Sequence, residues 1–248
     1  MNITWDINED DIIKVKEIVT ASQNTFVSGR IAKNVKRHNI EINKNLILKR
    51  LIMCLLTSQQ RSGPNSPIAV FLRRVPFPLT IEIISTESNI EEYVKATLQQ
   101  NGLNRFINKI HNYFTTNYNR LCDSNWSILN DLASLNGHAS KEIERKIADN
   151  LSDMFIGFGP KQSRNFLQAL GLTKYEIPID SRITDWLNKF GFPVTLNSTA
   201  LQDKGYYHFV SDGIQILCER ANIYPCVLDA AIFSSIDNNQ WTVENNIY

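Results

Sequence analysis

Apolar residues recur at the spacing of an α-helix along most of the chain. Near the amino end, Ile12, Val15 and Ile18 follow this spacing and predict an amphipathic helix. Residues 46–56 are apolar on nearly every side, which predicts a central, buried helix. The same spacing predicts further helices at residues 68–73, 90–98, 106–114, 126–135, 143–154, 183–190, 206–220 and 225–235. The fold class expected from this pattern is all-α.

Glycine and proline lie mainly between these segments. Ten Gly and eight Pro are few for 248 residues, which favours helices joined by short turns over many strands. Residues 62–64, Ser-Gly-Pro, end the central helix and leave residues 58–61 at its carboxyl end. After Gly171 the pattern changes to a loop at residues 173–178, and a domain boundary is expected nearby.

The net charge points to no strongly charged partner. Twenty-six Lys and Arg against 25 Asp and Glu leave a charge of +1, so any basic surface must be local. The longest apolar stretch, residues 46–56, is shorter than the roughly 20 residues that a membrane span needs. The acidic amino-terminal residues do not resemble a signal peptide. We expect no membrane partner and a cytoplasmic location, associated with the nucleoid if the source is prokaryotic.

The four cysteines form no pattern typical of a zinc site, an iron–sulfur cluster or a disulfide framework. Cys218 and Cys226 are the nearest pair, with seven residues between them. A structural zinc site uses tighter pairs such as C-x2-C. We expect free, buried thiols and no transition metal.

The most informative segment covers residues 154–191. A Gly-Phe-Gly turn at residues 157–159 stands between two predicted helices, and Pro160 suits the first position of the second one, where its missing N–H costs nothing. This arrangement predicts a helix–hairpin–helix, with Gly171 as the left-handed cap that ends the second helix. The open amino end of that helix would present unpaired N–H groups and the positive end of the helix dipole. A phosphate fits such a site.

Two cations, Lys161 and Arg164, stand in the first turn of this helix, where the dipole disfavours positive charge. One interpretation is a pair that neutralises phosphate. The other is that Lys161 is a nucleophilic amine. Its neutral form costs on the order of 4–5 kcal/mol at pH 7, and the dipole, Arg164 and partial burial would reduce that cost.

Asp180 comes shortly before the predicted helix at residues 183–190, a position typical of an N-cap. A capping carboxylate can also face a site, so the two roles are compatible. Two other phosphate-binding motifs do not fit the glycine-rich turn. Gln162 stands where a dinucleotide fingerprint has its third Gly, no strand is predicted before it, and the spaced Gly-Lys-Ser/Thr of a P-loop is absent.

With these residues, the segment resembles the helix-hairpin-helix DNA glycosylase superfamily. Residues 157–161, GFGPK, match the form G-h-G-x-K of its bifunctional members, in which the Lys begins the second helix. Residues 178–180, PID, match the loop P-h-D that follows. Lys161 precedes Asp180 by 19 residues, a spacing similar to that of 8-oxoguanine DNA glycosylases. Weaker similarities at residues 55–60 and 102–110 extend the resemblance over residues 46–191.

The resemblance implies two helical domains that flank a DNA-binding cleft. The first, residues 46–173, would be a helical barrel that contains the hairpin, and the second would be built from residues 1–45 and 174–248. The implied activity is that of a DNA glycosylase with AP lyase activity in base excision repair, with 8-oxoguanine as the favoured base. Lys161 would form a Schiff base with the sugar, and Asp180 would stabilise the cationic sugar and move protons.

The family also implies which residues hold DNA. Gln59 or Gln60 would fill the gap left by a flipped base. Arg182 stands where the family commonly has a phosphate-binding His. Contacts to phosphate position the DNA without specifying a base. The residues expected to contact DNA are Gln59, Gln60, Arg61, Gly157, Gly159, Arg164 and Arg182.

The implied partner is double-stranded DNA with a damaged or modified base, bound by a monomer. The cysteines that hold an iron–sulfur cluster in one branch of the family are absent, so no cluster is expected. A weak K⁺ or Na⁺ at the hairpin is compatible with the resemblance. Three alternatives stay open: a monofunctional glycosylase in which Asp180 activates water, a non-catalytic helix-hairpin-helix DNA-binding protein, and a helical scaffold unrelated to DNA.

Overall fold

The computed structural model describes residues 4–36, 40–58, 60, 62–137, 139–237 and 239–246. Over these residues the chain is helical and contains no β-strand, which confirms the prediction of an all-α protein. Among the helices of this described part, none is long and apolar enough to cross a lipid bilayer. The helical elements are α1 (Glu9–Ala21), α2 (Thr25–Arg30), the π-helical η1 (Ile31–Lys36), α3 (Lys44–Leu56), α4 (Pro67–Leu72), α5 (Ile81–Ile84), α6 (Ile90–Gln100), α7 (Ile107–Asp123), α8 (Ile128–Ala133), α9 (Lys141–Met154), α10 (Pro160–Leu170), α11 (Ser181–Phe190), the 3-10 helix η2 (Ala200–Gln202), α12 (Lys204–Ala221) and α13 (Pro225–Ile236).

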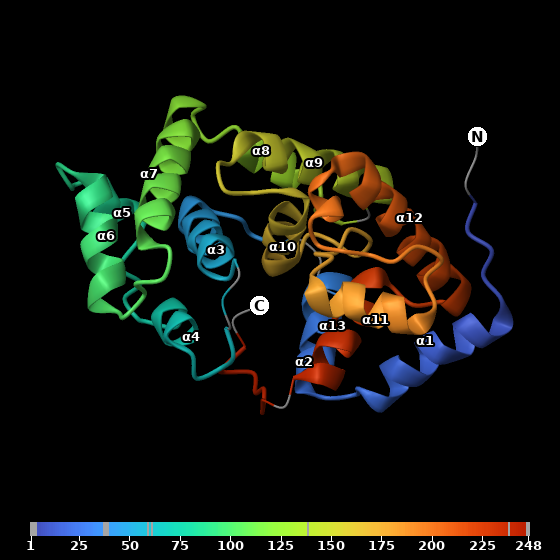
Figure 1. Ribbon diagram of the computed structural model, residues 1–248. Helices are drawn as coiled ribbons and strands as arrows, with labels where there is room; N and C mark the ends of the chain where they lie inside the picture. Colours follow the sequence, from blue (N-terminus) through green and yellow to red (C-terminus); the bar gives the residue numbers. More distant parts are fainter. Residues whose placement is uncertain are drawn as a thin grey trace.

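Buried apolar side chains form two clusters. The first draws its residues from positions 40 to 172. The second combines positions 12 to 27 with positions 177 to 241, so both ends of the chain contribute to it. In Figure 1, α3 to α7 lie on the left, α1, α2 and α11 to α13 lie on the right, and α10 lies between the two groups.

Helix α3 forms the centre of the first cluster. The Asn43 side chain accepts a hydrogen bond from Leu46 N at 2.9 Å and caps its amino end. Eight of its 13 residues are buried, in agreement with the nearly all-round apolar pattern of residues 46–56. It packs against α7 on one side and α10 on the other.

Helix α10 is more deeply buried than its sequence indicates. Every residue of this helix is buried except Lys161, which keeps partial exposure to solvent. Five of the buried residues are polar, and Gln162, Arg164 and Gln168 have partners outside the helix; for example, Gln162 Nε2 donates to Cys54 O of α3 at 2.8 Å. Gly171 ends the helix with a φ of 83°, as its predicted role of left-handed cap requires.

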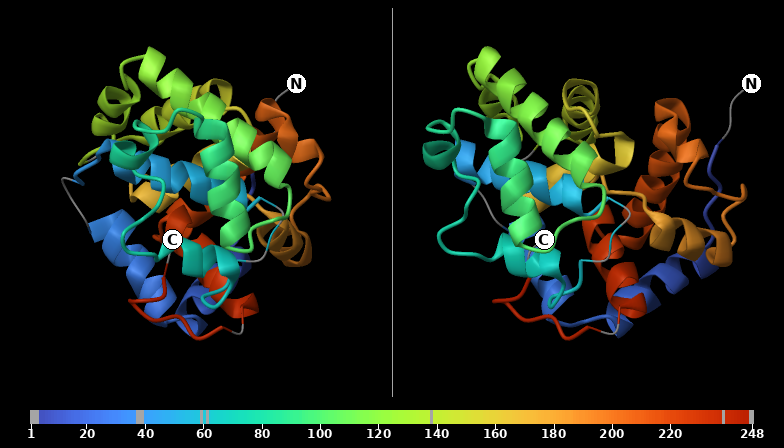
Figure 2. Two further views of the ribbon diagram at one scale, coloured as in Figure 1. Left: turned by 90° about the vertical axis from the view of Figure 1, so that its left-hand side faces the viewer. Right: turned by 60° about the vertical axis from the view of Figure 1, so that its left-hand side comes forward.

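The carboxyl-terminal segment returns from α13 toward α4 (Figure 2). Trp241 packs against Phe26 and Phe233, with ring centroids 5.3 and 5.9 Å away, and its Nε1 donates to Asp237 Oδ2 at 2.6 Å. Further along, Arg73 Nη1 donates to Asn245 O at 3.1 Å. Through these contacts the segment touches helices of both hydrophobic clusters.

Candidate active site

The turn between α9 and α10 is held in place by side chains on both sides. Asn117 of α7 forms two hydrogen bonds with Ile156, accepting from its N–H at 2.8 Å and donating to its carbonyl at 2.9 Å. Phe158 packs against Phe155 and Phe166, with centroids 5.1 and 5.9 Å away. The turn is therefore a rigid part of the first hydrophobic cluster.

Gly157 has a φ of 84°, in the left-handed region that favours glycine, and a Cβ added to it would lie 2.5 Å from Tyr113 Cδ2. We expect Gly157→Ala to lower the free energy of unfolding by about 2–4 kcal/mol, because backbone strain and the clash add together. Gly102→Ala is the matched control, since Gly102 has a φ of 73° but no atom within 4 Å of an added Cβ. Urea denaturation measures both, and equal losses for the two variants would contradict the role of Tyr113.

The amino end of α10 has no side-chain cap. Gly159 is the N-cap residue and offers no side-chain acceptor, and Pro160 occupies the first helical position as predicted. The positive end of the dipole therefore lies next to Lys161, the only residue of the helix that is not fully buried. Binding of phosphate by the amides of Gly157 and Gly159 stays a prediction.

The amine of Lys161 lies in surroundings that favour its neutral form. Burial lowers the pKa of Lys161 below its ordinary value of 10.5, and the positive charge of Arg182 lowers it further. The negative charges of Asp180 and Asp229 act in the opposite direction, so the structure brings these carboxylates within electrostatic range of the amine. Among the described residues, no carboxylate forms an ion pair with Lys161 within 4.0 Å.

This lowered pKa has a consequence for stability. Lys161→Met should raise the free energy of unfolding at pH 7 by about 1–2 kcal/mol, because it removes a desolvated cation. A lysine with a depressed pKa in the folded state penalises folding below its unfolded pKa, and this penalty fades as the pH rises toward 10.5. The advantage of the variant should therefore shrink between pH 7 and pH 10. The exposed Lys189 provides the control, since Lys189→Met should show no comparable gain at any pH.

Asp180 caps the amino end of α11, which confirms its predicted role as N-cap. Its Oδ1 accepts hydrogen bonds from the backbone N–H groups of Arg182 at 2.9 Å and Ile183 at 3.2 Å. Its Oδ2 accepts from Arg182 Nε at 2.8 Å, and the guanidinium lies over the Phe233 ring, 4.3 Å from its centroid. These contacts fix the orientation of the carboxylate, and its side chain is 16% exposed.

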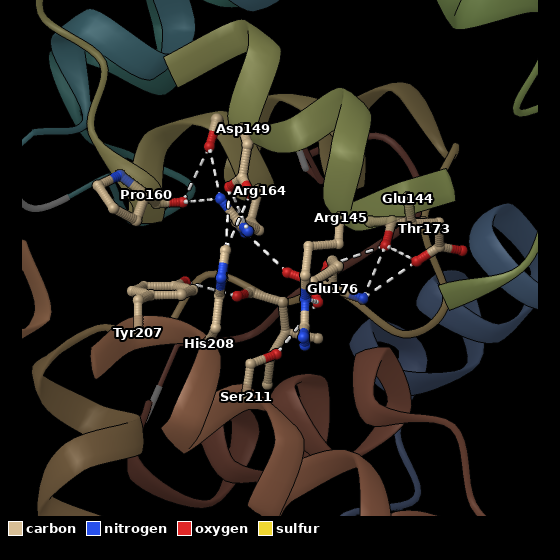
Figure 3. A network of polar contacts seen from close by, with 12 residues as sticks. Glu144, Arg145, Asp149, Pro160, Arg164, Thr173, Glu176, Tyr207, His208 and Ser211 are labelled. Carbon is tan, nitrogen blue, oxygen red and sulfur yellow. Dashed lines mark hydrogen bonds and ion pairs between the residues drawn. The ribbon is translucent and has the colours of Figure 1, made fainter. Parts of the chain in front are cut away.

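The prediction that Arg164 contacts DNA phosphate is wrong. Its side chain has no exposed surface, so no external phosphate can reach it. The guanidinium instead pairs with Glu176 Oε2 at 2.8 Å and Asp149 Oδ1 at 2.9 Å, as Figure 3 shows. The cation in the first turn of α10 is tolerated because two buried or partly buried carboxylates neutralise it.

The other predicted DNA contacts have different outcomes. Gln59 and Arg61 lie outside the described residues. Gln60 is partly buried, and within the described chain its Nε2 has no hydrogen-bond partner. Arg182 is 40% exposed and pairs with Asp180, so its contact with phosphate stays a prediction.

Asp229 of α13 is a residue that the sequence analysis did not identify. Its Oδ2 accepts from Gln168 Nε2 at 2.8 Å and lies 3.5 Å from Arg30 Nη1. Burial raises the pKa of Asp229, and the nearby negative charge of Asp180 raises it further, although Arg30 opposes the shift. The sequence did contain a signal for Asp229, since it is the single acid within the apolar stretch of residues 226–233. A carboxyl in such a stretch is expected to be buried, and a buried carboxyl needs specific partners.

The cysteines follow the prediction with one exception. Cys54, Cys218 and Cys226 are free and buried, and burial raises the pKa of Cys54 to about 12. Cys122 is free but exposed, so the prediction of burial is wrong for this residue. It lies in the last turn of α7, one residue before the helix ends and on its solvent side.

No protein-family model matches the chain, and the curated proteins contain no significant match to it. The chemistry of the site therefore rests on its own geometry. A lysine with a lowered pKa within electrostatic range of a fixed carboxylate can attack an electrophilic carbon and form a Schiff base with an aldehyde. In the part of the chain that the structure describes, no group of three or more His, Cys, Asp or Glu is arranged to hold a metal ion.

Proposed function

We propose that the protein is a DNA glycosylase with AP lyase activity that works through Lys161 and Asp180. The observation that carries the proposal is the Lys161 amine: Lys161 is the only residue of helix α10 that is not fully buried, burial lowers the pKa of its amine, and the amine lies within electrostatic range of Asp180. A Schiff-base lysine needs this combination, because the neutral amine is the nucleophile.

The surrounding architecture supports the same proposal. Helices α9 and α10 with their glycine-containing turn would form the helix–hairpin–helix, and its uncapped amino end would receive a DNA phosphate. We take the first hydrophobic cluster, apart from Ile40, as the core of the implied domain of residues 46–173, and the second cluster as the core of the domain built from the two terminal segments. Lys161 and Asp180 would then face DNA from opposite sides of the boundary between them.

The proposed reaction begins with a damaged base turned out of the duplex. As the bond between the base and the sugar C1′ breaks, the base departs with the electron pair, and the Asp180 carboxylate stabilises the positive charge that develops on the sugar. The neutral Lys161 amine attacks C1′ and loses a proton, for which Asp180 is the acceptor within range. Opening of the sugar ring gives a Schiff base, and β-elimination then breaks the strand on the 3′ side of the site.

The proposed substrate is double-stranded DNA with a damaged or modified base, and 8-oxoguanine is the base tested first. The spacing of Lys161 and Asp180 is similar to that of 8-oxoguanine DNA glycosylases, which supports this choice. The reaction as written needs no metal ion, because every step uses the Lys161 amine, the Asp180 carboxylate or the departing base.

Borohydride trapping tests the proposal. The protein is incubated with duplexes that contain 8-oxoguanine, uracil, a thymine mismatch or an abasic site, and borohydride then reduces any Schiff base to a stable covalent adduct. We expect an adduct with the wild type and with Lys189→Gln, a change at an exposed lysine of α11, and none with Lys161→Gln.

The outcomes separate the alternatives. An adduct that persists in Lys161→Gln would overturn the assignment of the nucleophile. Release of free base without any adduct would indicate a monofunctional glycosylase in which Asp180 activates water. Salt-sensitive DNA binding with neither adduct nor base release would indicate a non-catalytic DNA-binding protein.

A further inference from the structure

The loop from α10 to α11 is buried although it has no regular secondary structure. Its residues Thr173 and Glu176 are 0% exposed, Ile177 is 1% exposed and Ile179 is 3% exposed. Backbone N–H and C=O groups away from water need hydrogen-bond partners, and a loop without a helix or sheet must find them in side chains. The side chains that supply those partners therefore hold Asp180 in place, because Asp180 is the residue at the end of the loop.

Glu144 of α9 holds the first half of the loop. Its carboxylate accepts hydrogen bonds from the backbone N–H groups of Lys174 and Tyr175, each at 2.9 Å, and of Glu176 at 3.0 Å. The hydroxyl of Thr173 also donates to it (Figure 3). Burial raises the pKa of Glu144, and these four hydrogen bonds act against that shift. All four donors belong to residues 173–176.

Tyr207 of α12 holds the second half. Its hydroxyl accepts a hydrogen bond from Ile179 N at 2.8 Å and donates one to Ile177 O at 2.7 Å. Pro178, between these two residues, has no N–H to satisfy. The hydroxyl therefore pairs the backbone on both sides of Pro178, one residue before Asp180.

The same tyrosine touches the helix that carries Lys161. The Arg164 guanidinium lies over its ring, 4.9 Å from the centroid, and Arg164 Nε donates to Glu176 Oε2 at 2.8 Å (Figure 3). Arg164 stands three residues after Lys161 on α10. Tyr207 is thus in contact with the helix of the amine and with the loop of the carboxylate at once.

We propose that Tyr207 is a positioning residue that sets the place of the Asp180 carboxylate relative to the Lys161 amine. The inference rests on the proposed function, because the reaction gives this distance its importance. Tyr207 touches neither DNA nor the reacting atoms in this assignment. Burial raises the pKa of Tyr207, so its hydroxyl remains a donor to Ile177 throughout the pH range of an assay.

Tyr207→Phe removes the hydroxyl and keeps the ring over which Arg164 lies. At saturating enzyme, we expect the rate of base excision to fall about 10–100-fold with little change in DNA affinity, because a small displacement of a reacting group has effects of this size. Adduct formation at a preformed abasic site should fall less, since the aldehyde there reacts with Lys161 after the base has left. An effect on affinity alone would overturn the proposal.

Two controls separate positioning from a general loss of stability. Ile214→Val thins the core beside the same face of α12 and should reduce stability without moving the loop. Tyr206→Phe removes a hydroxyl from the neighbouring, partly exposed tyrosine. Both controls should keep excision within about threefold of the wild type. If Tyr207→Phe and Ile214→Val have the same unfolding midpoint and Tyr207→Phe excises the base no more slowly, the role of Tyr207 is only structural and the proposal fails.

A measurement without DNA distinguishes failure of this inference from failure of the proposed function. The Asp180 charge raises the pKa of Lys161, so a displaced carboxylate should let that pKa fall further. NMR titration of isotope-labelled lysine amines should show a lower pKa for Lys161 in Tyr207→Phe and in the reference variant Asp180→Asn, and no change in Tyr206→Phe. An unchanged Lys161 pKa in Tyr207→Phe would overturn the positioning role, whether or not the wild type excises a base.

Discussion

Asp180→Asn should slow base excision by about 10²–10⁴-fold while leaving the protein folded. The carboxylate lies within electrostatic range of Lys161, and in the proposed reaction it stabilises the cationic sugar and takes a proton. Asparagine keeps the oxygen that accepts from the N–H groups of Arg182 and Ile183, and it caps helices as well as aspartate does. We therefore expect the loss to concern the reaction rather than the fold.

Single-turnover kinetics on the duplex that gives the strongest adduct measures this loss, and thermal unfolding measures stability. Asp203→Asn is the matched control, because Asp203 caps α12 by accepting from Tyr206 N at 2.8 Å. We expect that control to excise at close to the wild-type rate. Excision by Asp180→Asn within about threefold of the wild type would remove Asp180 from the proposed mechanism.

Arg164→Leu should lower the free energy of unfolding by about 3–5 kcal/mol, because it removes one of the two cations that neutralise the buried carboxylate of Glu176. Arg164 and Glu176 are both 0% exposed and their charged atoms lie 2.8 Å apart. The positive charge that stays near Glu176 is Arg145, whose Nε lies 2.8 Å from Oε1. Arg145 also pairs with Asp212, so without Arg164 the buried Glu176 carboxylate shares its remaining cation with a second carboxylate and is only partly compensated.

Urea denaturation of three variants tests this expectation. Arg220→Leu is the matched control, because Arg220 and Glu9 form an exposed pair 3.8 Å apart, and its loss should cost at most about 1 kcal/mol. The double variant Arg164→Leu/Glu176→Leu should recover part of the loss, since it replaces the partly compensated carboxylate with an apolar group. If Arg164→Leu lowers the free energy of unfolding no more than Arg220→Leu does, the buried pair contributes no more to stability than the exposed pair.

The features of the site that depend on residues close by in the sequence could be predicted from the sequence. Pro160 at the first helical position, Gly171 as a left-handed cap and Asp180 as an N-cap are all found in the structure. Each of these roles depends on hydrogen bonds or backbone angles within about four residues, which a linear pattern contains. The all-α class follows for the same reason, because helical periodicity is local.

The environment of Lys161 and Arg164 could not be predicted in the same way. The two cations stand three residues apart in one helical turn, yet Lys161 is partly exposed and has a lowered pKa, whereas Arg164 is fully buried. The two residues differ in burial, and burial depends on how helices from distant parts of the chain pack around them. The sequence pattern offered a phosphate-binding pair, and the carboxylates of Glu176 and Asp149 exclude that role for Arg164.

The sequence by itself determined the helices, their caps and the order of the chemically active residues in the segment 154–191, because these depend on contacts between near neighbours. The tertiary structure alone decided which partners satisfy the buried polar groups. Glu144 reaches a loop about 30 positions further along the chain, and Tyr207 reaches back to Ile179 across 28 positions. Such partners meet only when the helices pack, since a buried N–H or charge accepts whichever complementary group the fold brings to it.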